Sequence, residues 1–245
     1  MIHNIEHTTL FNGNVTVYQP EQGYRFALDS VVLAAFTPAK DHQTVLELGI
    51  GVGAASLALA FQHPNITIHG IEIQTDIIPI TQKNIDANGW TNRFKVFSGN
   101  LTTRLVDGHY YDHVMMNPPF FEGHTYTDSP YAHKTLSHGE SDGLLKDWIH
   151  EAHRALKSRG YITIVHTARR LDEILSLLTE KFGGIEVFPL WPKLGTPAKR
   201  VLVRARKSVN SPMKLHAGLV LHQEDGTFTP ESAQIIHQGQ KINAI

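Results

Sequence analysis

The chain has 245 residues, of which 41% are hydrophobic and 18% charged; its formal net charge is −1 and it contains no cysteine. This composition suits one sizeable α/β core and excludes disulfides, thiol nucleophiles and cysteine-ligated zinc. The near-zero charge excludes a general attraction to nucleic acid, so RNA would need a local basic patch. No apolar run approaches the ~20 residues of a membrane span and residues 1–7 lack a secretory signal, so we expect a cytoplasmic protein.

Residues 1–40 predict a hairpin followed by a helix. Residues 8–18 resemble two short strands around a turn rich in asparagine and glycine. Asp29 is a suitable N-cap for the next helix, which Pro38 ends. Arg25 stands between two aromatic residues just before this helix, so it is either a surface charge or a residue that faces a ligand.

A glycine turn follows the first strand of the central region. Residues 44–48 form a short apolar strand, Gly49, Gly51 and Gly53 follow, and residues 54–61 predict a helix packed on the sheet. Glycines let a ligand approach the backbone closely, and the helix amino terminus offers N–H groups to a negative group. The same spacing also fits the NAD fingerprint, so the turn alone leaves the cofactor open.

Two acidic residues flank this turn in the sequence. Glu47 precedes the first glycine by two positions and can hold a cationic amino group, which S-adenosylmethionine carries and NAD lacks. The structural alternative is a capped or solvated strand end. Glu72 follows the next strand, residues 66–71. Its spacing from Gly49 along the sequence is that expected of a carboxylate that accepts ribose hydroxyls. With its neighbour Ile73, it is a predicted cofactor contact.

Residues 75–116 predict a helix and two strands, the second of which runs into Asn117. Residues 75–87 predict a helix and residues 93–97 a strand, after which Asn100 can meet an adenine or simply form a turn. Residues 111–116 are a buried strand that runs into Asn117.

The run Asn117-Pro118-Pro119-Phe120-Phe121 is the most specific motif of the chain. Neither proline can donate to a sheet, so Asn117 is held at the carboxyl end of a strand, where open α/β sheets bind ligands. The Asn117 amide oxygen and the Pro118 carbonyl can both accept from a planar NH₂ group, while Phe120 offers a ring for stacking. The structural alternative is a stiff turn with a packed aromatic.

The remaining pattern predicts a fold class. Residues 122–143 are polar and long enough for a lid. The later expected elements are helices over 144–156, 171–182 and from about residue 230, strands over 161–165, 185–190 and 201–205, and one strand in the tail. We predict a doubly wound, mostly parallel seven-stranded α/β sheet with an antiparallel last strand and an N-terminal hairpin extension. One domain is expected, with the core at 41–207 between an N-terminal part at 1–40 and a C-terminal part at 208–245.

Charge and histidine patterns leave further hypotheses. Lys199, Arg200 and Arg204 belong to a basic stretch that either follows RNA phosphates or protects an edge strand. The sixteen histidines include no His-Glu-x-x-His pattern, and we expect no metal site.

With these motifs placed, the chain resembles the class I S-adenosylmethionine-dependent methyltransferases with a Rossmann-like sheet. It is most similar to the tRNA-Val adenine-N6 methyltransferases of the small-domain superfamily. The closer likeness is carried by residues 23–29, 117–121 and 199–205. Two departures are Asn100, where such enzymes commonly have Asp, and Phe120, where many have Tyr.

The resemblance implies a role for each candidate residue. Glu47 and the glycines would seat the methionine part of the cofactor, Glu72 the ribose and Asn100 the adenine. Asn117, which also borders the cofactor, would act with Pro118 and Phe120 on the N6 amine of an adenine in tRNA. The expected substrate contacts are Arg25, Pro119, Phe121, Lys199, Arg200 and Arg204. Alternatives are guanine-N2 or glutamine-amide methylation, an NAD-dependent oxidoreductase, and a non-catalytic RNA-binding module.

Overall fold

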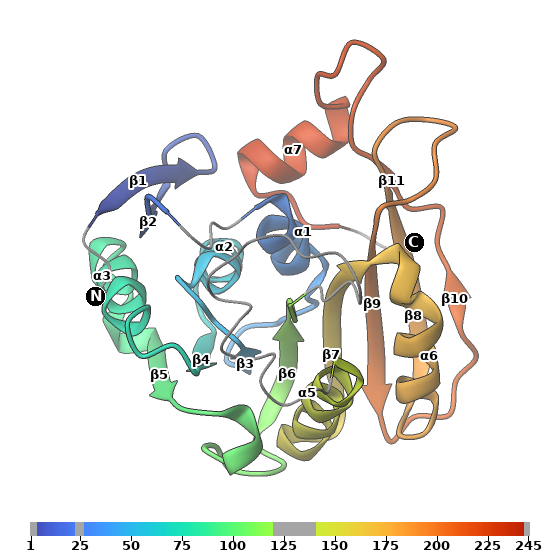
Figure 1. Cartoon of the computed structure of the whole chain (residues 1–245), viewed down its shortest axis with the longest axis horizontal. Helices are drawn as coiled ribbons and strands as arrows, with labels where there is room; N and C mark the ends of the chain where they lie inside the picture. Colours follow the sequence, from blue (N-terminus) through green and yellow to red (C-terminus); the bar gives the residue numbers. More distant parts are fainter. Residues whose placement is uncertain (1–3, 23–26, 120–140, 243–245) are drawn as a thin grey trace.

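A mostly parallel sheet forms the centre of the molecule, and the computed structural model describes residues 4–22, 27–119 and 141–242 (Figure 1). Its strands are β3 (Thr44–Leu48), β4 (Thr67–Glu72), β5 (Phe94–Ser98), β6 (Tyr111–Met116), β7 (Leu156–Thr167), β8 (Phe182–Trp191), β9 (Arg200–Lys207), β10 (Lys214–Leu215) and β11 (Leu219–Val220). They are arranged in the order β10-β8-β9-β7-β6-β3-β4-β5, with β11 also paired to β8. The seven longer strands confirm the predicted sheet.

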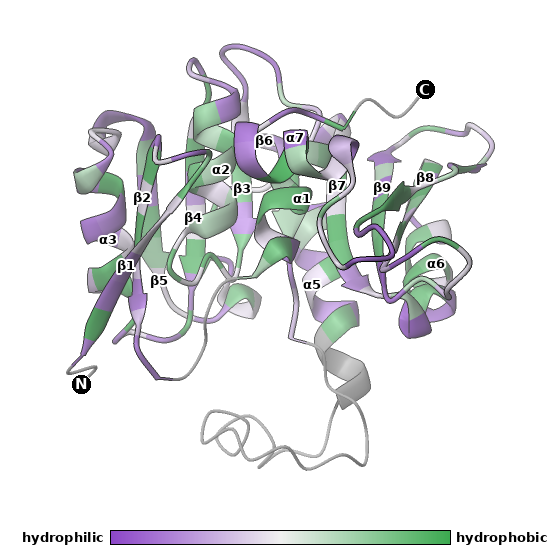
Figure 2. Ribbon diagram, turned by 90° about the horizontal axis from the view of Figure 1, so that it is seen from above, coloured by the Kyte–Doolittle hydropathy of each residue, from purple (hydrophilic) through white to green (hydrophobic). Residues whose placement is uncertain are grey.

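Helices cover both faces of this sheet. They are α1 (Leu28–Phe36), α2 (Ala54–Gln62), α3 (Ile78–Ala87), α5 (Ser141–Ala155), α6 (Leu171–Thr179) and α7 (Pro230–Gln238), with short 3-10 turns η1 (Thr91–Arg93), η2 (Leu101–Thr103) and η4 (Ala168–Arg170). One buried hydrophobic cluster joins α1, α2 and α7 to one face, and a second joins α5 and α6 to the other. Figure 2 shows green, hydrophobic stretches along the central strands. The doubly wound arrangement is therefore confirmed.

Strand β9 is antiparallel to both of its neighbours, β7 and β8, as predicted for the last long strand. It lies inside the sheet, however, because the chain turns back after β8 and inserts between β8 and β7. The hypothesis that its arginines protect an edge strand is therefore wrong.

The N-terminal extension is an antiparallel hairpin of β1 (Ile5–Leu10) and β2 (Val15–Pro20), as the sequence predicts. Helix α3 and its C-cap residue hold it through two asparagine side chains one helical turn apart. Asn84 exchanges hydrogen bonds with the backbone N–H (2.6 Å) and carbonyl (2.9 Å) of Tyr18. Asn88 does the same with Thr16, at 3.0 and 2.8 Å. The two side-chain amides therefore make the backbone hydrogen bonds with β2 that a neighbouring strand would otherwise make.

Two local expectations differ from the structure. Asp29 lies in the first turn of α1, where Ala27 is the capping residue, and its carboxylate instead accepts from Arg200 Nε at 3.0 Å. Helix α6, expected over 171–182, ends at Thr179, and Gly183 and Gly184 belong to β8. A Cβ at Gly183 would lie 1.9 Å from the Val209 carbonyl, so glycine is needed there for the close approach of a neighbouring segment.

Helix α5 passes directly into β7, which begins five residues earlier than predicted. The side chain of Lys207 explains the junction, because its buried ammonium group donates to the carbonyls of His153 (2.6 Å) and Leu156 (2.8 Å). These bonds satisfy carbonyls that the end of a helix leaves unpaired. In the part of the chain that the structure describes, no helix has the length and apolar character to cross a membrane.

Candidate functional site

The predicted motifs end in one row at the carboxyl edge of the sheet. Leu48 of β3 is paired with Ile71 of β4 and with Met116 of β6. The next residues of the three strands, Glu72, Gly49 and Asn117, therefore lie side by side. Since neighbouring strands are about 4.8 Å apart, the row spans roughly 10 Å from Glu72 to Asn117. The structure thus brings the proposed cofactor and catalytic motifs together.

The glycine turn has a backbone that only glycine adopts readily. Gly49, Gly51 and Gly53 have φ values of 67°, 53° and 86°, and Gly53 is the N-cap of α2. A Cβ at Gly49 would lie 2.5 Å from the ring of Trp148, which α5 places beneath the turn. Trp148 belongs to the helix expected over 144–156, but the sequence does not indicate that it contacts Gly49. That contact depends on how α5 packs against the turn.

We expect Gly49→Ala to destabilise the protein by about 1–3 kcal/mol through backbone strain and the clash with Trp148. Gly89→Ala is a matched control, because Gly89 has a similar φ of 69° and open space around its would-be Cβ. Denaturant unfolding of both variants measures the difference. Equal losses of stability would show that Trp148 yields to the added methyl group.

Glu47 is buried beside the amino terminus of α2. Its carboxylate accepts from the backbone N–H of Ser56 at 3.1 Å and from the Ser56 hydroxyl. Burial is the main reason that its pKa rises from 4.5 to about 8, and repulsion from Glu72 adds to it. The carboxylate therefore caps the helix, and the solvated alternative is wrong. A cationic ligand group arriving here would favour the charged form of Glu47.

Glu72 is held rigidly on the other side of the turn. Its two carboxylate oxygens accept from the backbone N–H groups of Gly51 and Gln74, each at 2.8 Å. Burial raises the pKa of this carboxyl as well. The neighbouring Ile73 is 60% exposed, which is unusual for a large apolar side chain at a strand end. A rigid acceptor and an apolar surface are thus available for a ribose and a flat ring.

Asn100 is exposed and already has hydrogen-bond partners. Its Oδ1 accepts from both the backbone N–H and the hydroxyl of Thr102, each at 3.0 Å, and so caps the short turn η2. The expectation was that this oxygen would accept from adenine. With both acceptor positions used, Nδ2 is the atom of this amide that remains able to donate to a ligand.

The Asn117 side chain is partly exposed at the end of β6, Pro118 is buried and Pro119 is exposed. None of the described residues hydrogen-bonds to the Asn117 side chain, so its amide is available at this edge. The predicted roles of Arg25, Phe120 and Phe121 and the lid over 122–143 fall outside the described residues, except that 141–143 begin helix α5.

The basic stretch divides into two parts. Arg200 lies at the same edge as Asn117, opposite Thr167 at the end of β7, and the neighbouring Lys199 is exposed. Arg204 lies four residues further along β9, about 13 Å away. Its guanidinium pairs with Glu186 at 2.8 Å and is 12% exposed. The predicted substrate role of Arg204 is therefore corrected to a structural one.

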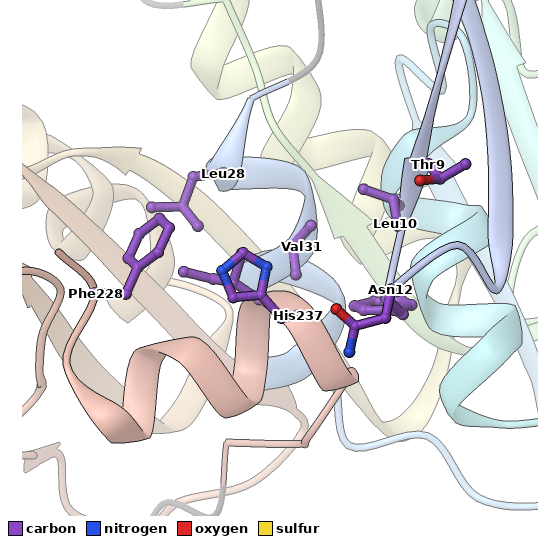
Figure 3. Close-up of a pocket in the computed structure, with 9 residues that line it drawn as sticks. Thr9, Leu10, Asn12, Leu28, Val31, Phe228 and His237 are labelled. Atoms are coloured by element: carbon purple, nitrogen blue, oxygen red, sulfur yellow. The ribbon is translucent and has the colours of Figure 1, made fainter.

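Open space also occurs away from the row of motifs. A hollow of about 430 Å³ lies between the hairpin, α1 and α7. Figure 3 shows Leu28, Phe228 and His237 facing one another there. None of the predicted site residues lines it. Among residues 4–22, 27–119 and 141–242, no three acidic or histidine side chains come together as a metal site requires.

Comparisons with known proteins agree with this geometry. A model of the methyltransferase small domain family matches residues 25–189. The chain is 28% identical over 219 residues to the tRNA1(Val) (adenine(37)-N6)-methyltransferase of Shewanella baltica (strain OS185), covering 87% of this chain and 91% of the relative. It is 25% identical over 222 residues to the Parabacteroides distasonis protein of the same name, with the same coverage. A predicted O-methyltransferase from Agrobacterium tumefaciens superposes with a TM-score of 0.74 at 23% identity, covering 89% and 99% of the two chains.

The order of the strands, the antiparallel β9 and the glycine turn beside two carboxylates define a class I S-adenosylmethionine-dependent methyltransferase. The cofactor is S-adenosylmethionine, and the NAD alternative is set aside. The residues present fit this cofactor, because the turn carries no side chain at positions 49, 51 and 53 and the two buried carboxylates of Glu47 and Glu72 suit its cationic and hydroxyl groups. The chain belongs to the methyltransferase small domain family.

Proposed function

We propose that this enzyme transfers a methyl group to the exocyclic N6 amine of an adenine in tRNA, with the anticodon loop of tRNA-Val as the target. The observation that carries the proposal is the placement of Asn117 in one row with Gly49 and Glu72. The similarity to proteins named tRNA1(Val) (adenine(37)-N6)-methyltransferase supports the choice of acceptor.

The cofactor would be held by groups on both sides of the glycine turn. Glu47 is suited to its amino group, and the N–H groups at the start of α2 are suited to its carboxylate. Glu72 is suited to the ribose hydroxyls, with Ile73 and Asn100 beside the adenine. When bound, the cofactor supplies a methyl group on a positively charged sulfur.

Asn117 and Pro118 would prepare the acceptor nitrogen. The Asn117 amide oxygen and the Pro118 carbonyl accept its two N–H bonds, which bends the nitrogen from planar and directs its lone pair toward the methyl group. The rate gain then comes from orientation and electrostatics. The methylated amine is a strong acid, so its proton leaves to water. The target base must first leave its stack, which costs least in a single-stranded loop.

The acceptor is identified by its product. The purified enzyme is incubated with labelled cofactor and with separate tRNA, rRNA and peptide fractions, followed by mass spectrometry of nucleosides and amino acids. We expect N6-methyladenosine in tRNA. Label in a guanine N2 or a glutamine amide would overturn the proposal in favour of another planar NH₂ group, since the Asn117 and Pro118 acceptors suit all three.

Lys199 is the clearest candidate for a tRNA phosphate contact, because it is exposed next to Arg200 at the edge of the site. We expect Lys199→Ala to lower the slope of log K against log salt concentration for tRNA by about 0.7–0.9, the share of one phosphate contact. Lys40→Ala removes an exposed lysine elsewhere and serves as the control. An unchanged slope for Lys199→Ala would remove this residue from the tRNA surface. Arg25, Pro119 and Phe121 remain proposed contacts.

A further inference from the structure

The outer side of the glycine turn is held by buried polar side chains of helix α3. Thr81 is fully buried, and its hydroxyl donates to the carbonyl of Gly51 at 2.5 Å. Asn84 is also fully buried, and its Nδ2 donates to the carbonyl of Val52 at 2.8 Å. Two successive carbonyls of the turn are therefore directed into α3.

The same turn is held from the opposite side by Glu72. The backbone N–H of Gly51 donates to Glu72 Oε2 at 2.8 Å, while its carbonyl accepts from Thr81. Both polar groups of one glycine are thus fixed by side chains from different elements. A glycine at positive φ has many other conformations available, so these contacts select the one in which the turn lies open beside Glu47.

Asn84 also connects this turn to the N-terminal hairpin. Its amide makes both hydrogen bonds to the backbone of Tyr18 and a third to Val52. Asn88 makes the equivalent pair to Thr16, but its third hydrogen bond goes to the carbonyl of Asn84 within α3. The two asparagines therefore hold the hairpin alike, and only Asn84 reaches the cofactor turn.

We propose that Thr81 and Asn84 are positioning residues that hold the glycine turn in its cofactor-binding conformation through their direct hydrogen bonds to its carbonyls. This inference rests on the proposed placement of the cofactor at the turn. Neither side chain touches that position, because both act through the carbonyls of Gly51 and Val52. Loss of either donor leaves a carbonyl unpaired, partly buried at Gly51 and buried at Val52, and the turn rotates to recover a partner.

The first test uses an isosteric pair of variants at Thr81. Thr81→Val removes the hydroxyl and keeps the shape, whereas Thr81→Ser keeps the hydroxyl. Calorimetry with S-adenosylhomocysteine should show about tenfold weaker binding for Thr81→Val and near-normal binding for Thr81→Ser. Turnover at saturating cofactor should stay within about twofold, since Asn117 is untouched. Equal affinities of Thr81→Val and the wild type would overturn the proposal.

The second test compares Asn84→Ala with Asn88→Ala. Both should lower the thermal stability and raise amide exchange in β2, but only Asn84→Ala should raise exchange in residues 50–53 and weaken S-adenosylhomocysteine binding. If both variants weaken binding equally, Asn84 acts only through the hairpin and the proposal fails. Wild-type protein that does not bind S-adenosylhomocysteine would refute the cofactor placement itself, which is a separate outcome.

Discussion

Asn117→Ala should abolish detectable methyl transfer, a fall of at least about a thousandfold in the single-turnover rate. The amide oxygen is one of only two proposed acceptors for the reacting NH₂ group, and a methyl side chain cannot replace it. The fold should tolerate the change, because the side chain is partly exposed and none of the described residues hydrogen-bonds to it. Cofactor affinity should stay within a few-fold, since Glu47 and Glu72 are unaffected.

The Asn92→Ala variant is the control for this result. Asn92 is exposed in η1, just before the amino end of β5 and away from Asn117, so the same substitution there should leave the single-turnover rate unchanged. Rapid-quench measurement with labelled cofactor gives the rate, and calorimetry with S-adenosylhomocysteine gives the affinity. A rate for Asn117→Ala within tenfold of the wild type would remove Asn117 from the mechanism.

Glu47→Gln should weaken cofactor binding by roughly 10- to 100-fold, the loss expected when a buried charged hydrogen bond is replaced by a neutral one. The wild-type carboxyl is mostly protonated at pH 7, because its pKa is about 8. Binding of a cationic amino group should therefore release on the order of one proton. Calorimetry in buffers of different ionisation enthalpy measures this release, which should disappear in the variant.

The same substitution should stabilise the free enzyme at alkaline pH. Since the folded-state pKa of Glu47 lies above 4.5, the folded protein binds the proton more tightly than the unfolded chain, and wild-type stability falls as the pH rises from about 4.5 to 8. The glutamine variant avoids this loss, which amounts to ~1.4 kcal/mol for each unit of pKa shift. Its melting temperature should exceed that of the wild type at pH 8–9 and match it near pH 5.

Glu180→Gln is the control, since Glu180 is exposed at the end of α6 and the change should alter neither quantity. Wild-type-like affinity in Glu47→Gln would mean that the amino group of the cofactor binds elsewhere. A melting temperature below that of the wild type at pH 9 would show that the charged carboxylate stabilises α2 by more than its burial costs.

The sequence predicted most of the sheet because parallel strands and glycine turns have strong local patterns. It could not place β9, because the alternation of Arg200, Arg204 and Arg206 is the same for an edge strand and for an inner strand flanked by charged partners. Asp29 has the side chain of a good N-cap, yet the ion pair with Arg200, distant in the chain, determines its orientation. The outcome of such competition between a local and a tertiary partner cannot be predicted from the neighbouring sequence.

The sequence likewise predicted only part of the candidate site. The residues with proposed chemical roles, such as Glu47, Glu72 and Asn117, follow from their positions at strand ends. The residues that support them do not, because Trp148 and Thr81 meet the glycine turn only after α5 and α3 pack on the sheet. In the sequence, Trp148 and Thr81 are simply an aromatic residue and a threonine within expected helices, and nothing there marks them as contacts of the turn.

The insertion of β9 between β7 and β8 has a consequence for biosynthesis. A nascent chain that has emerged only as far as Trp191 has β7 and β8 but lacks the strand between them. It also lacks Lys207, so the carbonyls at the end of α5 that accept from this lysine have no donor yet. Two apolar strand edges stay open until the ribosome has released residue 207. Premature termination between residues 191 and 207 therefore leaves a fragment with both edges unpaired and prone to aggregation.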